Sequence, residues 1–328
     1  MAVVFMEGFD HLTSSQYPAK GWLGWVRFVG TGRFSGQSAH IDNGDRCYHY
    51  LPGTYTTLIV GAALNTPNLT NDMLYLRSGG TNVVKLNATL VGGQYVLRLL
   101  NAANTQLAYG TTPVFANTWI YVEIKVVVSA TVGTVELRLN GASTSELSAS
   151  GVNTGALAID NICMVGDASM YVDDIYAVDP ATGSSPTNTW LGEVRVATLA
   201  PNGNGTYTAW TNAYTDWDDI TSADDDTTYV SSSTPGDRET STLTDLSAAT
   251  STVFAVQTNL VARKDDAGTR TIAPVVVIGG TPYDGTTTAA LSSSYLDYTQ
   301  LYDRLAPDGN VWDVTKVNAM ETGVKEIA

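Results

Sequence analysis

Two stretches of the chain, WIYVEIKVVV at residues 119–128 and TVELRLNG at residues 134–141, carry its most regular pattern. In the first stretch, apolar side chains occupy every second position and alternate with Tyr121, Glu123 and Lys125. Such alternation predicts β-strands that turn one face to a core and the other to solvent. The Asn-Gly pair that ends the second stretch predicts a tight turn.

The residues before these stretches continue the pattern in shorter runs. Turn signals, such as Ser-Gly-Gly at 78–80 and Gly-Gly at 92–93, separate segments that are rich in apolar residues. A turn after about every 10–12 residues is typical of a β-sandwich. The predicted strands are residues 55–63, 72–77, 83–90, 94–100 and 105–111.

The order of these motifs resembles that of concanavalin A-like and laminin-G-like domains. In that family a W-x-x-V-x-I strand precedes a hairpin that ends in Asn-Gly, as residues 119–124 and 135–141 do. Residues 171–179 are similar to the family's closing strand, which returns beside the first, and residues 7–10 (EGFD) are similar to a common opening. The resemblance covers residues 1–180 and implies a jelly-roll sandwich of the lectin type.

The composition changes after residue 179. Residues 180–189 are rich in Pro, Ser and Thr, which predicts a linker between a first domain at 1–179 and a second domain at 190–328. In the second domain, the predicted strands are residues 191–198, 253–263 and 270–278.

The end of the chain has a different periodicity. Apolar residues from Val314 to Val324 recur at helical spacing, and Asp313 is the predicted N-cap, whereas residues 295–305 fit either a strand or a helix. The predicted fold class is therefore all-β. It comprises a concanavalin A-like jelly roll and a second β-rich, sandwich-like domain with a short C-terminal helix.

Five segments of the second half form a further set: residues 191–196 (LGEVRV), Trp210, 226–230, 262–268 and 312–318. This set resembles a module of tailed-bacteriophage virion proteins, which often follows a lectin-like domain. The resemblance implies a structural protein with other virion proteins as partners and without an active site.

The chain is acidic, with a formal net charge of −15. Residues 1–180 hold 9 Lys and Arg against 13 Asp and Glu, and residues 181–328 hold 8 against 19. This balance disfavours binding to nucleic acid or to an anionic membrane, because both attract basic surfaces. No stretch approaches the roughly 20 apolar residues of a membrane span, and residues 1–6 lack the basic start of a signal peptide. We therefore expect a virion protein made in the host cytoplasm, without membrane insertion.

Some glucanases have the fold expected for the first domain, so their catalytic motif is the first sign of an enzyme to look for. Retaining glucanases of the fold carry two catalytic carboxylates on one strand, typically as Glu-x-Asp-x-x-Glu, at the short separation that the reaction needs. The sequence lacks this motif. Its three histidines, His11, His40 and His49, accompany no Gly-x-Ser-x-Gly nucleophile motif. We therefore expect no enzymatic activity.

Two binding hypotheses remain for the first domain. Lectin-like sandwiches often hold a structural Ca²⁺ near the first and last strands, so Glu7 and one of Asp173 and Asp174 are candidate ligands, with Asp10 close by in the sequence. The alternative is that these carboxylates accept backbone hydrogen bonds or lie at the sheet edge.

The second hypothesis concerns aromatic side chains, on which sugar rings stack. Five of them lie in or near the irregular region before the predicted strands, and they form a candidate surface for glycan or partner contact. The alternative is that they fold over the core. These residues are Trp22, Trp25, Tyr48, Tyr50 and Tyr55.

Three functions follow from these patterns. The favoured one is a tail or baseplate fibre or adhesin whose lectin-like domain contacts host surface polysaccharide or neighbouring virion subunits. The alternatives are a capsid decoration or head-fibre protein, and a glycan hydrolase. Because weak glycan contacts gain from multivalency, we expect a homotrimer or a higher array.

Overall fold

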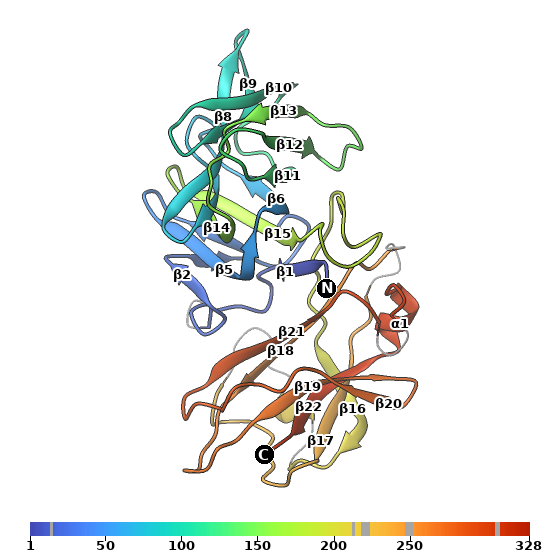
Figure 1. The fold of residues 1–328 in the computed structure, drawn as a ribbon. Helices are drawn as coiled ribbons and strands as arrows, with labels where there is room; N and C mark the ends of the chain where they lie inside the picture. Colours follow the sequence, from blue (N-terminus) through green and yellow to red (C-terminus); the bar gives the residue numbers. More distant parts are fainter. Residues whose placement is uncertain (14–15, 212–213, 218–223, 247–251, 306–308) are drawn as a thin grey trace. The chain divides into compact units, whose positions relative to one another are not determined.

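The computed structural model describes residues 1–13, 16–211, 214–217, 224–246, 252–305 and 309–328. It divides into two compact units (Figure 1). Unit 1 comprises Met1–Asp10 and Gly21–Val196, and unit 2 comprises His11–Lys20 and Ala197–Ala328. The division differs from the predicted one because residues 190–196 belong to unit 1 and residues 11–20 to unit 2.

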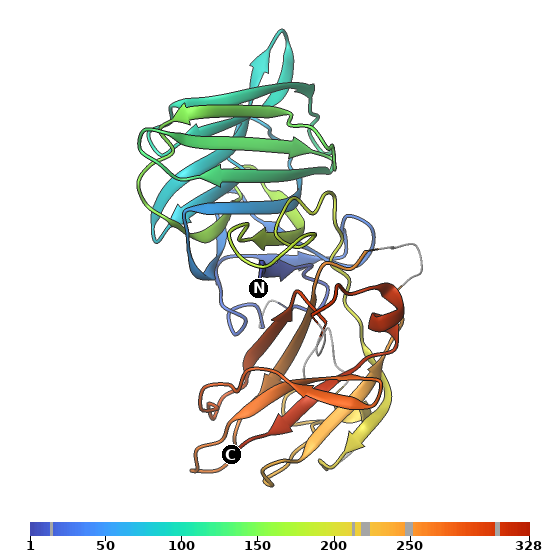
Figure 2. The ribbon, with the colours of Figure 1, turned by 45° about the vertical axis from the view of Figure 1, so that its right-hand side comes forward.

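Unit 1 is a sandwich of two antiparallel sheets (Figure 2). Sheet A has the strand order β13–β12–β11–β6–β15–β4–β3, and β1 also pairs with β15. Its strands are β1 (Val3–Glu7), β3 (Arg27–Val29), β4 (Ser38–Ile41), β6 (Thr57–Asn65), β11 (Ile120–Val127), β12 (Gly133–Leu139), β13 (Leu147–Val152) and β15 (Met170–Val178).

Sheet B has the strand order β10–β9–β8–β7–β14–β5–β2. Its strands are β2 (Trp22–Gly24), β5 (Arg46–Tyr55), β7 (Leu74–Ser78), β8 (Thr81–Val91), β9 (Gln94–Asn101), β10 (Gln106–Pro113) and β14 (Ile159–Val165). The predicted strands of the first domain are confirmed, and the closing strand β15 pairs with the first strand, with Glu7 opposite Ile175.

Strand β11 departs from the simple alternation. Its outer residues Tyr121 and Glu123 are both only 1% exposed, so the expected solvent-facing side is covered there. Residues 190–196 lie against this region, where the Gly192 amide donates to Glu123 Oε1 at 2.8 Å. The predicted strand at 191–198 is therefore wrong. The segment pairs with side chains of sheet A and forms no ladder with another strand.

The predicted linker also packs on unit 1. Thr187 is 1% exposed, and the Thr182 hydroxyl donates to the Met1 carbonyl at 2.6 Å. The Pro/Ser/Thr-rich composition indicates irregular backbone, but these hydrogen bonds show that the segment does not extend freely into solvent.

Unit 2 contains a five-stranded antiparallel sheet and a two-stranded one. The larger sheet has the order β16 (Pro201–Thr208), β17 (Arg238–Leu243), β22 (Glu321–Glu326), β19 (Ile272–Ile278) and β20 (Thr281–Asp284), and the smaller pairs β18 (Val256–Ala262) with β21 (Leu296–Tyr302). Residues 295–305 thus contain a strand and no helix. No helix in the described part of the chain is long and apolar enough to cross a membrane.

The predicted C-terminal helix is confirmed only at its start. Helix α1 (Val314–Asn318) begins after Asp313, whose side chain accepts from the Lys316 amide at 2.8 Å. The extension to Val324 is wrong, because β22 lies between β17 and β19. Gly323 permits this close pairing, since a Cβ there would lie 1.9 Å from the Glu239 carbonyl oxygen.

We expect Gly61→Ala to destabilise unit 1. Gly61 lies opposite Tyr176 in the β6–β15 pair, and an added Cβ would lie 2.1 Å from the Tyr176 ring. Overpacking of this kind costs about 1–3 kcal/mol of unfolding free energy, measurable by urea denaturation. Gly30→Ala is the control, because nothing lies within 4 Å of its Cβ position. Equal stabilities of the two variants would contradict this packing.

Candidate functional site

Strand β14 places residues from two distant segments on one face of sheet B. Tyr48 of β5 lies opposite Cys163 of β14, which in turn lies opposite Tyr75 of β7. Tyr50, Asn161 and Arg77 form the adjacent row in the same way. Cross-strand partners share one face of a sheet, so the two rows lie side by side.

This face is the outer one, which the sandwich core does not cover. Tyr50 is 45% exposed on this side of the sheet, although Asn161 and Cys163 at the centre of the face are as fully buried as Ile162 and Met164 on the other side. The same face continues onto β8 and β9, where Asn87 lies opposite Arg98. We call it the arginine–tyrosine face, and its residues are Arg46, Tyr48, Tyr50, Tyr75, Arg77, Lys85, Asn87, Arg98 and Asn161.

Arginine side chains fix the tyrosine rings of this face. The Arg46 guanidinium carbon lies 5.5 Å from the Tyr75 ring centroid, and that of Arg77 lies 5.6 Å from the Tyr48 centroid. Tyr48 and Tyr50 pack edge to face, with centroids 6.0 Å apart. Cation–π and edge-to-face contacts favour defined ring orientations. The face therefore presents ordered aromatic rings beside guanidinium groups.

A hydrogen-bonded network holds the other half of the face. Asp72 accepts from the Tyr75 hydroxyl and from Asn87 Nδ2, both at 2.8 Å, and Arg98 Nε donates to Asn87 Oδ1 at 3.0 Å. Burial, followed by the hydrogen bond to Asp72, raises the pKa of Tyr75. The tyrosine is therefore a neutral hydrogen-bond donor at physiological pH.

The predicted aromatic residues separate into four groups. Tyr48 and Tyr50 lie on the arginine–tyrosine face, and Trp25, 73% exposed, lies at the edge of sheet B, where its amide donates to the Arg46 carbonyl at 3.0 Å. Tyr55 is half-buried at the other end of β5. An exposed Trp22 is wrong, because its ring is 1% exposed and packs in the core against Phe5.

Sequence reasoning missed Tyr75, Arg77 and Asn161 as site residues. Tyr75 and Arg77 share a face because they stand two positions apart in a predicted strand, and this spacing was the available signal. No sequence pattern indicated Asn161, because its strand is buried on both sides and its polar and apolar residues do not alternate.

The residues predicted to bind calcium do not fit that role in this arrangement. Each oxygen of Asp173 and Asp174 accepts a hydrogen bond from the Arg33 or Asp174 backbone, the Arg33 side chain or the Val196 backbone. Glu7 accepts from the Phe9 amide at 2.8 Å and from the Trp22 indole at 3.4 Å.

In the ranges that the structure describes, no three acidic, histidine or cysteine side chains form a group able to hold a metal ion. The contacts correspond to the alternative reading, in which these carboxylates accept backbone hydrogen bonds. Calcium binding stays an untested prediction.

A protein cation lies at this position. The Arg33 guanidinium, 6% exposed, pairs with Asp174 at 3.3 Å and with Glu193 of the 190–196 segment. It also lies 4.8 Å from the Tyr121 ring centroid. Burial and the neighbouring Asp174 raise the pKa of Asp173 to about 7. This cluster attaches the 190–196 segment to sheet A.

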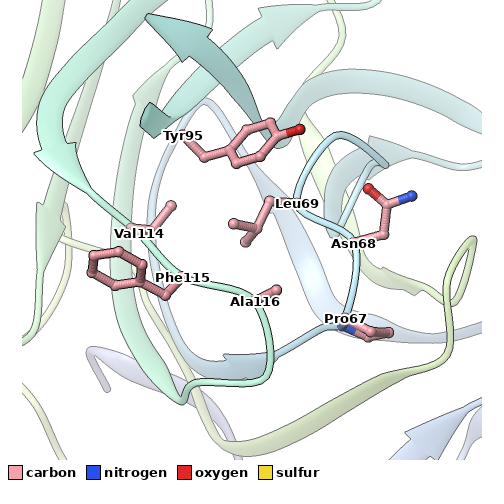
Figure 3. Close-up of a pocket in the computed structure, with 7 residues that line it drawn as sticks. All are labelled: Pro67, Asn68, Leu69, Tyr95, Val114, Phe115 and Ala116. Carbon is pink, nitrogen blue, oxygen red and sulfur yellow. The ribbon is translucent and has the colours of Figure 1, made fainter. Parts of the chain in front are cut away.

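A small pocket lies elsewhere on unit 1 (Figure 3). Its volume is about 180 Å³, and its wall is mostly apolar. The Asn68 amide oxygen, one of its few polar atoms, already accepts from the Thr70 amide at 3.1 Å. The pocket is therefore a weaker candidate than the arginine–tyrosine face. Its lining residues are Pro67, Asn68, Leu69, Tyr95, Val114, Phe115 and Ala116.

No protein-family model matches the chain, and no curated protein matches it. Among solved structures, it is similar to domain 4 of AbnA, a GH43 extracellular arabinanase from Geobacillus stearothermophilus, in complex with arabinotriose. Identity is 13% over 54% of this chain and 92% of that one, with a TM-score of 0.37.

Two further structures are similar. The VIP36 exoplasmic/lumenal domain in its Ca²⁺/Man2-bound form is 10% identical over 51% of this chain and 84% of its own, with a TM-score of 0.35. The carbohydrate-binding module CBM66 from Bacillus subtilis is 11% identical over 48% and 95%, with a TM-score of 0.31. The likeness is one of fold, and the ligand of this chain does not follow from it.

We expect Asp173→Asn to change the pH dependence of stability. The pKa of Asp173 is about 7 in the folded protein, against about 3.9 when unfolded. Its contribution to stability is therefore complete below about pH 4 and is lost as pH rises through 7. The stability of the variant relative to the parent should rise over that interval and then level off.

Urea denaturation from pH 4 to about 8 measures this difference. Asp42→Asn is the control, because Arg27 lowers the pKa of this exposed carboxyl and its removal should produce no such rise. A constant difference between Asp173→Asn and the parent would contradict the raised pKa.

Proposed function

We propose that this chain is a non-enzymatic polysaccharide-binding protein that uses the arginine–tyrosine face of unit 1. The observation that carries the proposal is that Tyr48 and Tyr50 share one outer sheet face with Arg77. Aromatic rings stack on the apolar side of a sugar ring, and guanidinium groups donate hydrogen bonds to its oxygens. A face that spans several strands suits an extended chain of sugars.

The non-enzymatic part of the proposal rests on the carboxylates. The sequence lacks the Glu-x-Asp-x-x-Glu motif of retaining glucanases of this fold, and Asp72, the acid bonded within the face, is engaged by Tyr75 and Asn87. The glycan hydrolase remains the alternative. Release of reducing ends from a bound polysaccharide would favour it.

The biological setting is proposed from sequence alone. The resemblance of residues 190–325 to a module of tailed-phage virion proteins supports a structural role in a virion, with other virion proteins as partners. We favour a tail or baseplate fibre or adhesin that contacts host polysaccharide as a homotrimer or higher array, because multivalency strengthens weak sugar contacts. A capsid decoration or head fibre is the alternative.

We expect Tyr48→Ala and Tyr50→Ala each to weaken polysaccharide binding by about tenfold, because loss of one aromatic stacking contact costs on the order of 1–3 kcal/mol. The measurement is retention of the full chain on a panel of immobilised bacterial surface polysaccharides. Tyr229→Ala is the matched control, since Tyr229 is 48% exposed in unit 2 and Tyr50 is 45% exposed.

A second comparison distinguishes the two surfaces of unit 1. Phe115→Ala removes a 65% exposed ring from the wall of the small pocket. Loss of binding in Phe115→Ala, with both tyrosine variants unaffected, would place the site in the pocket and contradict the proposal.

Antibody labelling of particles tests the virion assignment. We expect gold-labelled antibody to the chain to mark the tail of intact phage particles from a lysate that contains the protein. Labelling of the head would favour the capsid alternative, and unlabelled particles beside soluble protein would contradict a virion role. An antibody to the major capsid protein of the same phage serves as the positive control.

A further inference from the structure

The basic residues of the first 180 positions are unevenly distributed. Those positions hold 9 Lys and Arg in a chain of net charge −15. Four of the nine lie on the arginine–tyrosine face: Arg46, Arg77, Lys85 and Arg98. A predominantly acidic protein thus gathers much of the positive charge of one unit on the face proposed to bind sugar.

These four cations make no ion pair with an acid in the part of the chain that the structure describes. Arg77 donates to the Gly80 carbonyl at 2.6 Å, Lys85 donates to Asn104, and Arg98 donates to Asn87 at 3.0 Å. Elsewhere in unit 1, Arg27 pairs with Asp42, and Arg33 and Arg138 also have acidic partners.

Two acids lie near the cations of the face but do not pair with them. Asp72 accepts from the Tyr75 hydroxyl and from Asn87, and Asp167 is close enough to contribute to the raised pKa of Tyr75. A third acid, Asp160, precedes Asn161 in β14 and accepts from the Gly79 amide at 2.8 Å. The four cations outnumber these three acids.

An unsatisfied polar group lies within this face. Asn161 is fully buried, and neither its Oδ1 nor its Nδ2 has a hydrogen-bond partner in the part of the chain that the structure describes. The buried Nε of Arg77, its neighbour across the β14–β7 pair, has no oxygen or nitrogen partner among the described residues and lies near the Cys163 thiol. Buried polar atoms in folded proteins nearly always have partners, so such a pair points to a bound group that supplies them.

We propose that the arginine–tyrosine face selects acidic polysaccharides whose sugars carry carboxylate groups, an inference that rests on the proposed function. A guanidinium donates two parallel hydrogen bonds to a carboxylate, a geometry that a neutral hydroxyl does not match. Arg77 and Arg46 hold carboxylates of the ligand, and the rings of Tyr48 and Tyr50 stack against the sugars.

Asn161 completes the site beneath the exposed side chains. Its Nδ2 donates to, and its Oδ1 accepts from, a ligand hydroxyl next to the carboxylate. Because Asn161 is buried, this contact forms when the side chains of Tyr50 and Arg77, which flank it in register, shift on binding.

The spacing of the cations indicates a polymer. Neighbouring strands lie about 4.8 Å apart, so Arg46 on β5 and Arg98 on β9, four strand positions away, are separated by roughly 19 Å across the sheet. A single sugar does not reach both. A chain of several acidic sugars does, and each repeat meets another positive charge.

The test compares polymers that differ only in charge. The probes are polygalacturonate, hyaluronate and alginate, each beside the same polymer with its carboxyl groups methyl-esterified. We expect the full chain to bind at least one carboxylate form at least about tenfold more tightly than its ester, because charge-assisted hydrogen bonds are lost. The preference should fall as salt rises to about 0.5 M.

Three variants locate the effect. Arg46→Gln and Arg77→Gln should each reduce the preference for the carboxylate form over its ester by at least about fivefold. Arg27→Gln is the control, because Arg27 lies on β3 of sheet A and pairs with Asp42. Circular dichroism of each variant verifies the fold.

Each contrary result has a distinct meaning. Equal binding to every acid and its ester would overturn the acidic specificity. If Tyr48→Ala still loses that binding, the proposed function stands. A preference for poly(glycerol phosphate) over all three carboxylate polymers would overturn the assignment of a carboxylate as the recognised group. A preference for the carboxylate form that Arg46→Gln and Arg77→Gln leave unchanged would overturn its assignment to the arginine–tyrosine face. Failure to bind any polysaccharide would overturn both proposals.

Discussion

The pairing of β14 with both β5 and β7 is the constraint on which the candidate site depends. It places β14 between the residues near position 48 and the residues near position 76, two segments that are distant in sequence. The inner side chains of β14, Ile162 and Met164, lie in the sandwich core and fix its register. A slip by one residue would turn Asn161 and Cys163 inward and separate the two rows of the face.

Unit 1 treats its charged residues in two different ways. Around β15, the buried charged groups have partners: Arg33 pairs with Asp174 and Glu193, and backbone amides donate to Asp173. On the arginine–tyrosine face, the cations bond to neutral oxygens, and the Asn161 amide has no partner. The first arrangement attaches the 190–196 segment to the sandwich. The second leaves hydrogen-bonding capacity for a ligand, which is why the function is proposed there.

The sequence predicted those parts of the fold whose two sides differ. Strand β12 alternates because one side meets the core, and β11 alternates in residue type although residues 190–196 cover part of its outer side. The pairing of β15 with β1 followed from a family resemblance. Strand β14 is buried on both sides, so its polar and apolar residues do not alternate and no strand was predicted there. The segment at 191–196 alternates like a strand, but side chains of sheet A satisfy its backbone amides.

The site was predictable to a similar extent. Tyr48 and Tyr50 were found by residue type alone, and the same reasoning wrongly included Trp22, because type does not tell which side of a strand a ring occupies. Arg77 and Asn161 become site residues only through pairings between strands distant in sequence. The ion pair between Arg33 and Asp174 was not predictable for a related reason, because nothing local in the sequence places these two residues side by side.

The most direct test of the account is a crystal structure of the full chain with an oligosaccharide of the polymer that it binds most tightly. The account predicts sugar density along the outer side of β5, β14 and β7, with a ring against Tyr48 or Tyr50 and a ligand oxygen within hydrogen-bond distance of Arg77 and Asn161. Sugar bound in the pocket beside Phe115, or on sheet A, with the arginine–tyrosine face empty, would contradict it.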